Sequence, residues 1–172
     1  LPDKDFKVIA SNIVGAKVGG ELLWKGFNCL FFSSLGILLY ITARFEFRFA
    51  VGAIVALIHD VLVTLGIFSL FGREIDLPVI AAFLAIIGYS LNDTIIMYDR
   101  IGENMGKYHK ETFPFIVNRS INETLSRTLM TSITTLVVVM ALFIFGGGVI
   151  NNFAFALLIG IMIGTYSSVF VA

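Results

Sequence analysis

The chain of 172 residues is 58% hydrophobic and only 14% charged, and its mean hydropathy is +0.93. Soluble domains carry fewer apolar and more charged residues, so this composition predicts an integral membrane protein. The formal net charge of zero argues against an extended nucleic-acid-binding surface, which would need clustered Lys and Arg. Cys29 is the sole cysteine, which excludes an internal disulfide and a Cys-rich metal site.

Five apolar runs in the sequence are long enough to cross a bilayer as helices, which takes roughly 20 residues for a ~30 Å hydrocarbon core. Short connections with charged residues or glycine separate most of them. We therefore predict an all-α fold, a bundle of five transmembrane helices over residues 21–172. Pro78 suits the first turn of the third helix. The expected spans are residues 22–42, 49–71, 77–98, 127–145 and 153–172.

The two ends of the chain differ in character. Residues 1–20 mix charged side chains with three glycines and are too polar to cross a membrane, so we interpret them as the end of an extracytoplasmic segment. The chain begins at Leu1 rather than at Met, and it stops at Ala172 inside an apolar run. We therefore expect a fragment of a longer protein.

Basic residues in the short connections predict the orientation. Arg44 and Arg48 lie between the first two spans, and four more basic residues lie between the third and fourth. The other side has Arg73, with Lys17 and Lys25 near the start of the first span. Because basic residues favour the cytoplasmic side, we expect these two connections in the cytoplasm and the N-terminal residues outside.

A periodic apolar pattern marks the connection before the fourth span. Phe113, Ile116 or Val117, Ile121 and Leu125 recur at intervals of three to four residues among polar side chains. This pattern predicts an amphipathic helix that lies at the cytoplasmic membrane surface. Such a helix either packs under the bundle or docks a partner, and the sequence favours neither.

Asp93 is the residue that an ordinary membrane helix has least reason to contain. It follows Asn92 within the third span. A carboxylate near a helix centre costs ~2.5–3.5 kcal/mol on insertion scales, so it normally faces a partner or a water-filled route. Arg127 is the candidate partner, because Asp93 lies 17 residues before Lys110 and Arg127 lies 17 residues after it. Equal helical rise would then place both side chains at similar depth.

Hydroxyl groups continue from the arginine along one helix face. Thr128, Thr131 and Thr134 follow Arg127 at one, four and seven residues. Such hydroxyls can hydrogen-bond across helices or hold water. Two interpretations of Asp93 and Arg127 stay open. They form a buried ion pair that fixes helix register, or the carboxylate exchanges a proton as the guanidinium moves. The second follows the general rule that intramembrane ionisable groups mark ion routes.

Asp60, next to His59, is a second acid inside a predicted span. Neither residue has an obvious basic partner in the sequence. They form a local hydrogen-bonded pair or a second proton-relay site, and the two alternatives are equally open.

Small residues predict helix packing. Gly88 in the third span, and Gly160 with Gly164 in the fifth, would let neighbouring helices approach closely. The sequence has no nucleophile with an adjacent base, no phosphate-binding glycine loop and no metal-ligand cluster. We therefore expect that the chain is not an enzyme.

Several motifs also carry a family resemblance. They include Gly88-Tyr89-Ser90-Leu91-Asn92-Asp93-Thr94 and Ser126-Arg127-Thr128. In order along the chain the sequence resembles SecF proteins of the bacterial SecD/SecF protein-export family, which are similar to resistance-nodulation-division transporters. The matching stretches are residues 14–19, 44–50, 59–61, 87–101, 120–128 and 159–168.

The resemblance implies an accessory subunit of the Sec protein translocase in the inner membrane. Such a subunit uses the proton-motive force to assist preprotein export, with protons as the coupling ion and no cofactor. The implied partners are SecD, the SecYEG translocon, a preprotein, membrane lipid and YajC. The family's proton-route residues match Asp93 and Arg127, and Asp60 matches a motif position. A scaffold without proton conduction and a proton-coupled small-molecule exporter are the alternatives.

Overall fold

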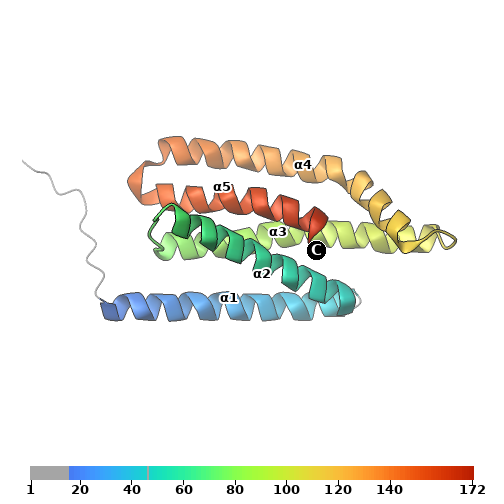
Figure 1. Cartoon of the computed structure of the whole chain (residues 1–172), viewed down its shortest axis with the longest axis horizontal. Helices are drawn as coiled ribbons and strands as arrows, with labels where there is room; N and C mark the ends of the chain where they lie inside the picture. Colours follow the sequence, from blue (N-terminus) through green and yellow to red (C-terminus); the bar gives the residue numbers. More distant parts are fainter. Residues whose placement is uncertain (1–15, 46) are drawn as a thin grey trace, which may run out of the picture.

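A computed structural model describes residues 16–45 and 47–172 as five α-helices with short connections (Figure 1). Each of the five helices contains a stretch long and apolar enough to cross a membrane, which confirms the predicted all-α fold. The helices are α1 (Ala16–Arg44), α2 (Phe47–Leu70), α3 (Leu77–Lys107), α4 (Phe113–Phe145) and α5 (Gly147–Phe170).

Helices α1, α3 and α4 extend beyond the spans predicted from apolar length. Residues 16–20, expected as part of the N-terminal tail, are helical in α1, and the rest of that tail lies outside the described residues. Helices α3 and α4 have 31 and 33 residues. At 1.5 Å per residue they are about 46 and 50 Å long, so both exceed a ~30 Å hydrocarbon core. The additional length lies where α3 ends and α4 begins. This part of the bundle is here called the α3–α4 end.

The expected surface helix is not a separate element. Residues 113–126 form the first part of α4, which continues without interruption and bends toward the end of α3 (Figure 1). No glycine or proline occurs between Phe115 and Phe145, so nothing in the sequence ends the helix there. Ile116 is only 5% exposed and packs against Tyr98 and Ile101 of α3. These contacts favour the packing interpretation of the amphipathic pattern.

Local signals fix two of the turns. Gly72 before α3 and Gly147 at the start of α5 adopt positive φ angles of 59° and 74°, which glycine tolerates best. The side chain of Asp76 caps α3 by accepting a hydrogen bond of 2.9 Å from the Val79 amide, and Pro78 lies in the first turn as predicted. Helix α5 begins at Gly147 rather than at the expected residue 153, because only Gly146 separates it from the end of α4.

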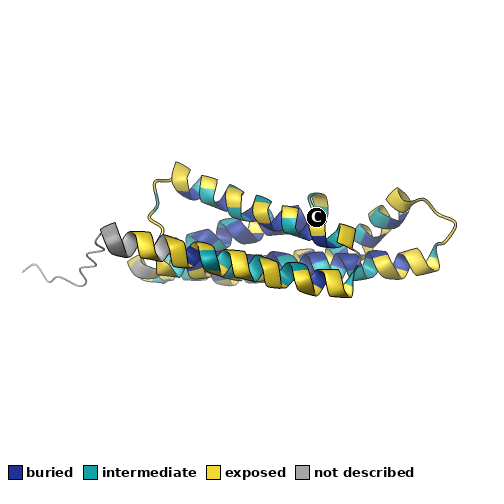
Figure 2. Ribbon diagram, turned by 90° about the horizontal axis from the view of Figure 1, so that it is seen from below, coloured by how far each residue is buried: buried dark blue, intermediate teal, exposed yellow. Residues whose placement is uncertain are grey.

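Helix α5 is the centre of the bundle and contacts α2, α3 and α4, whereas α1 lies along α2 and α3 (Figure 1). Figure 2 shows buried faces turned inward and exposed faces turned outward on the helices. Helices α3 and α5 run parallel and approach closely at two glycines. A Cβ added to Gly160 would overlap Ile86, and one added to Gly164 would lie 3.1 Å from the Ser90 Cβ. Gly88 is exposed and has open space around it within the described chain, so no described helix packs against it and its packing role stays a prediction.

Candidate functional site

Asp93 is buried in α3 with an exposed fraction of 3%. Within residues 16–45 and 47–172, its Oδ2 atom has no hydrogen-bond partner. Buried polar atoms almost always have a partner, in the protein or in ordered water. An orphan carboxylate oxygen therefore calls for water or for a group that reaches it in another conformation.

The antiparallel register of α3 and α4 shows what lies level with this carboxylate. Tyr89 of α3 donates a hydrogen bond of 3.2 Å from its hydroxyl to Ser132 Oγ of α4. Four residues further along α3 is Asp93, and four residues back along α4 is Thr128. Thr128 is 1% exposed, so a buried hydroxyl of α4 lies at the level of the acid.

The expected ion pair between Asp93 and Arg127 is not formed. In the described part of the chain, no ion pair or hydrogen bond involves the Arg127 guanidinium, and the residue is exposed. Arg127 instead lines a hollow between α3 and α4, together with Ile96 and Asp99. The physical reason is side-chain direction, because helical side chains tilt toward the helix N-terminus. For α4 this direction leads toward the α3–α4 end, where Arg127 lines the hollow.

Asp60 is enclosed more completely. It is 0% exposed, and both of its carboxylate oxygens have partners. Oδ1 lies 3.1 Å from His59 Nδ1, and Ser90 of α3 donates a hydrogen bond of 2.6 Å from Oγ to Oδ2. A Cβ on Gly164 of α5 would lie 3.6 Å from Oδ2, so glycine leaves room for this contact. The local His59–Asp60 pair is therefore present, and the relay role stays a prediction.

Within the described residues, no hydrogen bond joins Thr128, Thr131 or Thr134 to another helix. Thr131 Oγ1 donates to the carbonyls of Arg127 and Thr128 in its own helix, at 3.1 and 2.9 Å. The hydroxyl of Ser132, by contrast, reaches other helices, because it contacts Tyr89 of α3 and lies 2.7 Å from Thr165 Oγ1 of α5. The sequence places Ser132 next to Thr131 but does not show which of the two faces the bundle.

Asn92 lies away from the site that it was expected to support. It is exposed on α3, while the neighbouring Asp93 points inward. Ala81, Ala85 and Gly88 are also exposed on this helix, and with Asn92 they follow one another at intervals of four, three and four residues. These four residues, here called the α3 small-residue face, are not covered within the described chain.

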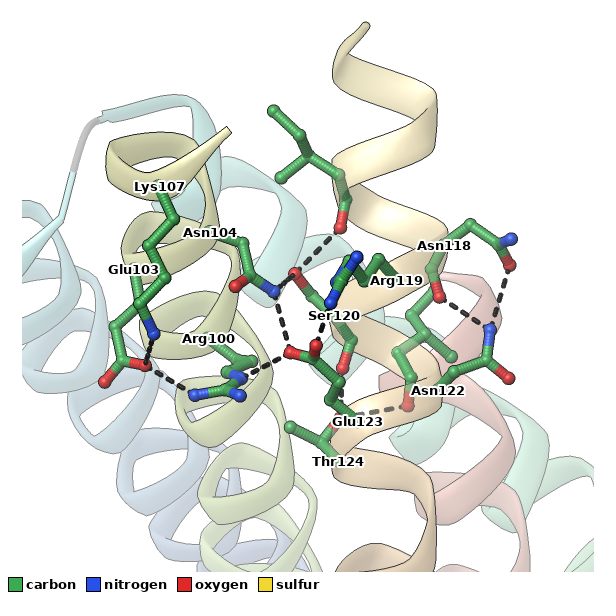
Figure 3. Close-up of polar contacts among 12 residues, drawn as sticks. Arg100, Glu103, Asn104, Lys107, Asn118, Arg119, Ser120, Asn122, Glu123 and Thr124 are labelled. Carbon is green, nitrogen blue, oxygen red and sulfur yellow. Dashed lines mark hydrogen bonds and ion pairs between the residues drawn. The ribbon is translucent and has the colours of Figure 1, made fainter. Parts of the chain in front are cut away.

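A polar cluster missed by the sequence interpretation ties α3 to α4 at the α3–α4 end (Figure 3). Glu123 of α4 accepts hydrogen bonds from Arg100 Nε at 2.7 Å, Asn104 Nδ2 at 2.9 Å and Arg119 Nε at 3.0 Å. Asn104 is buried, and Arg100 also donates to Glu103 at 2.6 Å. The Arg119–Glu123 and Arg100–Glu103 spacings of four and three residues are those of ion pairs within one helix, whereas the contacts between α3 and α4 leave no such pattern in the sequence.

Comparison with known proteins matches almost the entire chain. The sequence model for the C-terminal region of the protein export membrane proteins SecD/SecF covers residues 2–172. Protein translocase subunit SecF of Rhodothermus marinus is 52% identical over 178 residues, covering 100% of this chain and 58% of the relative. SecF of Desulfurispirillum indicum is 55% identical over 169 residues, covering 96% and 54%. The chain thus spans little more than half of these relatives.

Solved structures agree with the sequence matches. The crystal structure of SecDF from Thermus thermophilus, a translocon-associated membrane protein, aligns with a TM-score of 0.87 and 46% identity over 92% of this chain and 22% of that one. SecDF in its super-membrane-facing form aligns with a TM-score of 0.82 and 44% identity over 92% and 21%. The described residues form five helices suited to membrane spans, and together with the SecF relatives they make the chain a multi-pass protein of the inner membrane. It belongs to the SecD/SecF family of protein-export membrane proteins.

Proposed function

We propose that this chain is the transmembrane part of an accessory Sec translocase subunit that works with SecD and uses the proton-motive force to assist preprotein export. The names of the relatives and the matched SecDF structures support the translocase role. The single observation that supports proton coupling is the buried Asp93 with its unpartnered Oδ2. The proposal assigns no enzymatic reaction and no cofactor to the chain.

The proposed coupling acts through the charge of one residue. Protonation of Asp93 removes its attraction for Arg127, so the equilibrium between arrangements of α3 and α4 changes. Moving one elementary charge across ~100 mV releases about 2.3 kcal/mol, which changes such an equilibrium by roughly fiftyfold. Arg127 lies one residue from the level of Asp93 and also lines the hollow toward the α3–α4 end. It can therefore lie near Asp93 in one arrangement of the two helices and in the hollow in the other.

The α3 small-residue face is the proposed contact for the SecD half. Small side chains let helix backbones approach closely inside a membrane, and an exposed amide such as that of Asn92 can hydrogen-bond across the contact. The α3–α4 end is proposed to be cytoplasmic, because exposed Arg44, Arg48 and Lys107 gather there. SecYEG, YajC and the preprotein are proposed as further partners.

Asp60 is kept in the proposal as a second proton-holding group. His59 is partly exposed, with a side-chain exposure of 33%, so it could pass a proton to the enclosed carboxylate from outside the bundle. Both carboxylate oxygens of Asp60 already have partners, so the residue is also expected to stabilise the packing of α2 against α3.

The test is proton flux and preprotein translocation in vesicles that contain the full-length protein with SecD and SecYEG. Asp93→Asn and Arg127→Met are compared with Glu74→Gln, which makes the same kind of carboxylate change as Asp93→Asn at an exposed residue. We expect flux to be lost in Asp93→Asn, strongly reduced in Arg127→Met and retained in Glu74→Gln, with the complex intact in pull-downs. Unchanged flux in an intact Asp93→Asn complex would leave only the scaffold role.

A further inference from the structure

Matched residues face each other where α3 and α5 pack side by side (Figure 1). A Cβ on Gly160 of α5 would overlap Ile86 of α3, and one on Gly164 would lie 3.1 Å from the Cβ of Ser90. In both contacts the α5 residue is numbered 74 above its α3 partner. Because the two helices run parallel with the same rise per residue, this offset continues along them.

The offset places Ser167 of α5 level with Asp93 of α3. Ser167 lies three residues after Gly164, and Asp93 lies three residues after Ser90, which is about one helical turn in each case. Positions three or four residues apart share one face of a helix. Ser167 therefore lies on the face of α5 that packs against α3, and Asp93 lies on the face of α3 that packs against α5.

These two residues also hold the unsatisfied polar atoms of the interior. Within residues 16–45 and 47–172, the fully enclosed side-chain nitrogen and oxygen atoms without a hydrogen-bond partner are Asp93 Oδ2 and Ser167 Oγ. Ser167 is 0% exposed. A buried polar atom without a partner costs free energy. A serine hydroxyl can donate to a carboxylate oxygen, so each of the two atoms is a suitable partner for the other.

The neighbouring serine shows that the unsatisfied hydroxyl is particular to Ser167. Ser168 is 1% exposed, and its Oγ donates a hydrogen bond of 3.1 Å to the Thr165 carbonyl in its own helix. Helical serines commonly satisfy their hydroxyl in this way. Ser167 makes no such bond, so its hydroxyl is available to a group on another helix.

We propose that Ser167 is a positioning residue for Asp93, whose Oδ2 accepts a hydrogen bond from the Ser167 hydroxyl and is thereby held toward α5 while Arg127 lies in the hollow. The inference rests on the proposed proton-coupled function and adds a residue of α5 to its site. The two atoms are not hydrogen-bonded in the structure, so the bond requires a rotation of one of the side chains. A hydrogen bond to a carboxylate is stronger than one to a neutral acid, so this bond weakens when Asp93 takes up a proton.

The first test is a double-mutant cycle on thermal unfolding of the full-length protein in complex with SecD. Ser167→Ala should lower the unfolding temperature, and it should do so much less in an Asp93→Leu background, because leucine accepts no hydrogen bond. A hydroxyl that never finds a partner gives the opposite result, since its removal raises the unfolding temperature. A raised temperature in Ser167→Ala, or the same change with and without Asp93, would overturn the proposal.

Ser168→Ala is the matched control for both tests. It removes the hydroxyl of a neighbouring, similarly buried serine whose hydrogen bond stays within α5. Its effect on the unfolding temperature should be the same in the native and Asp93→Leu backgrounds.

The second test observes the carboxyl group directly and needs no doubly substituted chain. Infrared difference spectra between acidic and neutral pH should contain the C=O band of protonated Asp93, identified by its loss in Asp93→Asn. A hydrogen bond to the carbonyl oxygen lowers its stretching frequency. We therefore expect the band at higher frequency in Ser167→Ala and at the native frequency in Ser168→Ala. An unmoved band in Ser167→Ala would exclude the hydrogen bond.

Proton flux in vesicles separates this inference from the proposed function. Flux should fall severalfold in Ser167→Ala and be retained in Ser168→Ala. Flux that is lost in Asp93→Asn but unchanged in Ser167→Ala would refute the positioning role alone. If flux did not depend on Asp93 while Ser167→Ala still moved the infrared band, the proton-coupled function would be refuted and the hydrogen bond would stand.

Discussion

Ser90 of α3 and Asp60 of α2 are joined by a hydrogen bond of 2.6 Å inside the apolar bundle. Ser90 lies three residues before Asp93 on the same helix. The contact therefore fixes the height of α3 against α2, and with it the height of the candidate proton site. Gly164 of α5 completes the arrangement by leaving room beside both side chains.

Ser90→Ala should destabilise the protein. The substitution leaves Asp60 Oδ2 without its donor in a buried position, which costs about 1–3 kcal/mol for a bond to a buried polar or charged group. The measurement is thermal unfolding of the purified complex in detergent. Ser69→Ala, an exposed serine on α2, is the control and should leave the unfolding temperature unchanged. Equal unfolding temperatures for the two variants would contradict a stabilising Ser90–Asp60 contact.

Gly160→Ala should also destabilise the bundle, because the added Cβ overlaps Ile86 where α3 and α5 approach. Overpacking of this kind typically costs about 1–3 kcal/mol. Gly88→Ala is the matched variant, since the space around Gly88 is open within the described chain. The measurement is the free energy of unfolding of both variants. A greater loss of stability in Gly88→Ala than in Gly160→Ala would show that the helix packing differs from that described.

Gly88→Leu should reduce assembly with SecD without unfolding the chain. A large side chain on the α3 small-residue face would keep a partner helix from approaching. The amount of SecD recovered in a pull-down measures this effect. Gly36→Leu places the same side chain at an exposed glycine of α1 and should leave recovery unchanged. Full recovery of SecD with Gly88→Leu would place the partner elsewhere.

Arg73→Lys should weaken the other end of the bundle. The Arg73 guanidinium donates to Asn151 Oδ1 at 2.6 Å and to Asn152 Oδ1 at 2.8 Å, and it lies 4.1 Å from the ring centroid of Phe155. Lysine cannot reproduce this planar arrangement, so a loss of about 1–3 kcal/mol is expected in chemical unfolding. The exposed Arg48, changed to Lys, is the control. A similar small effect at both positions would mean that the Arg73 contacts contribute little.

Glu123→Ala should lower the unfolding temperature more than Glu103→Ala does. Glu123 accepts from donors on both helices, whereas Glu103 pairs with Arg100 and Lys107 of its own helix. Ion pairs within one exposed helix stabilise little. The ranking of the two unfolding temperatures is the measurement, and the reverse order would exclude Glu123 as the tie between α3 and α4.

The number of spanning helices in the described residues and the start of α3 could both be predicted from the amino-acid sequence. Both depend on local properties, namely the length of apolar runs and the capping turn at Asp76 and Pro78. The sequence also identified Asp93 and Asp60, because an acid in an apolar run is conspicuous without any structure.

Which side chains contact one another could not be predicted from the sequence, because it depends on how the helices pack. Equal residue counts suggested that Arg127 pairs with Asp93, yet the direction of the side chain along α4 takes it to the hollow instead. The partners Ser90 of Asp60 and Asn104 of Glu123 come from other helices. Contacts of this kind depend on the rotation and relative height of each helix, and packing sets both: a change of one residue turns a helical side chain by about 100°.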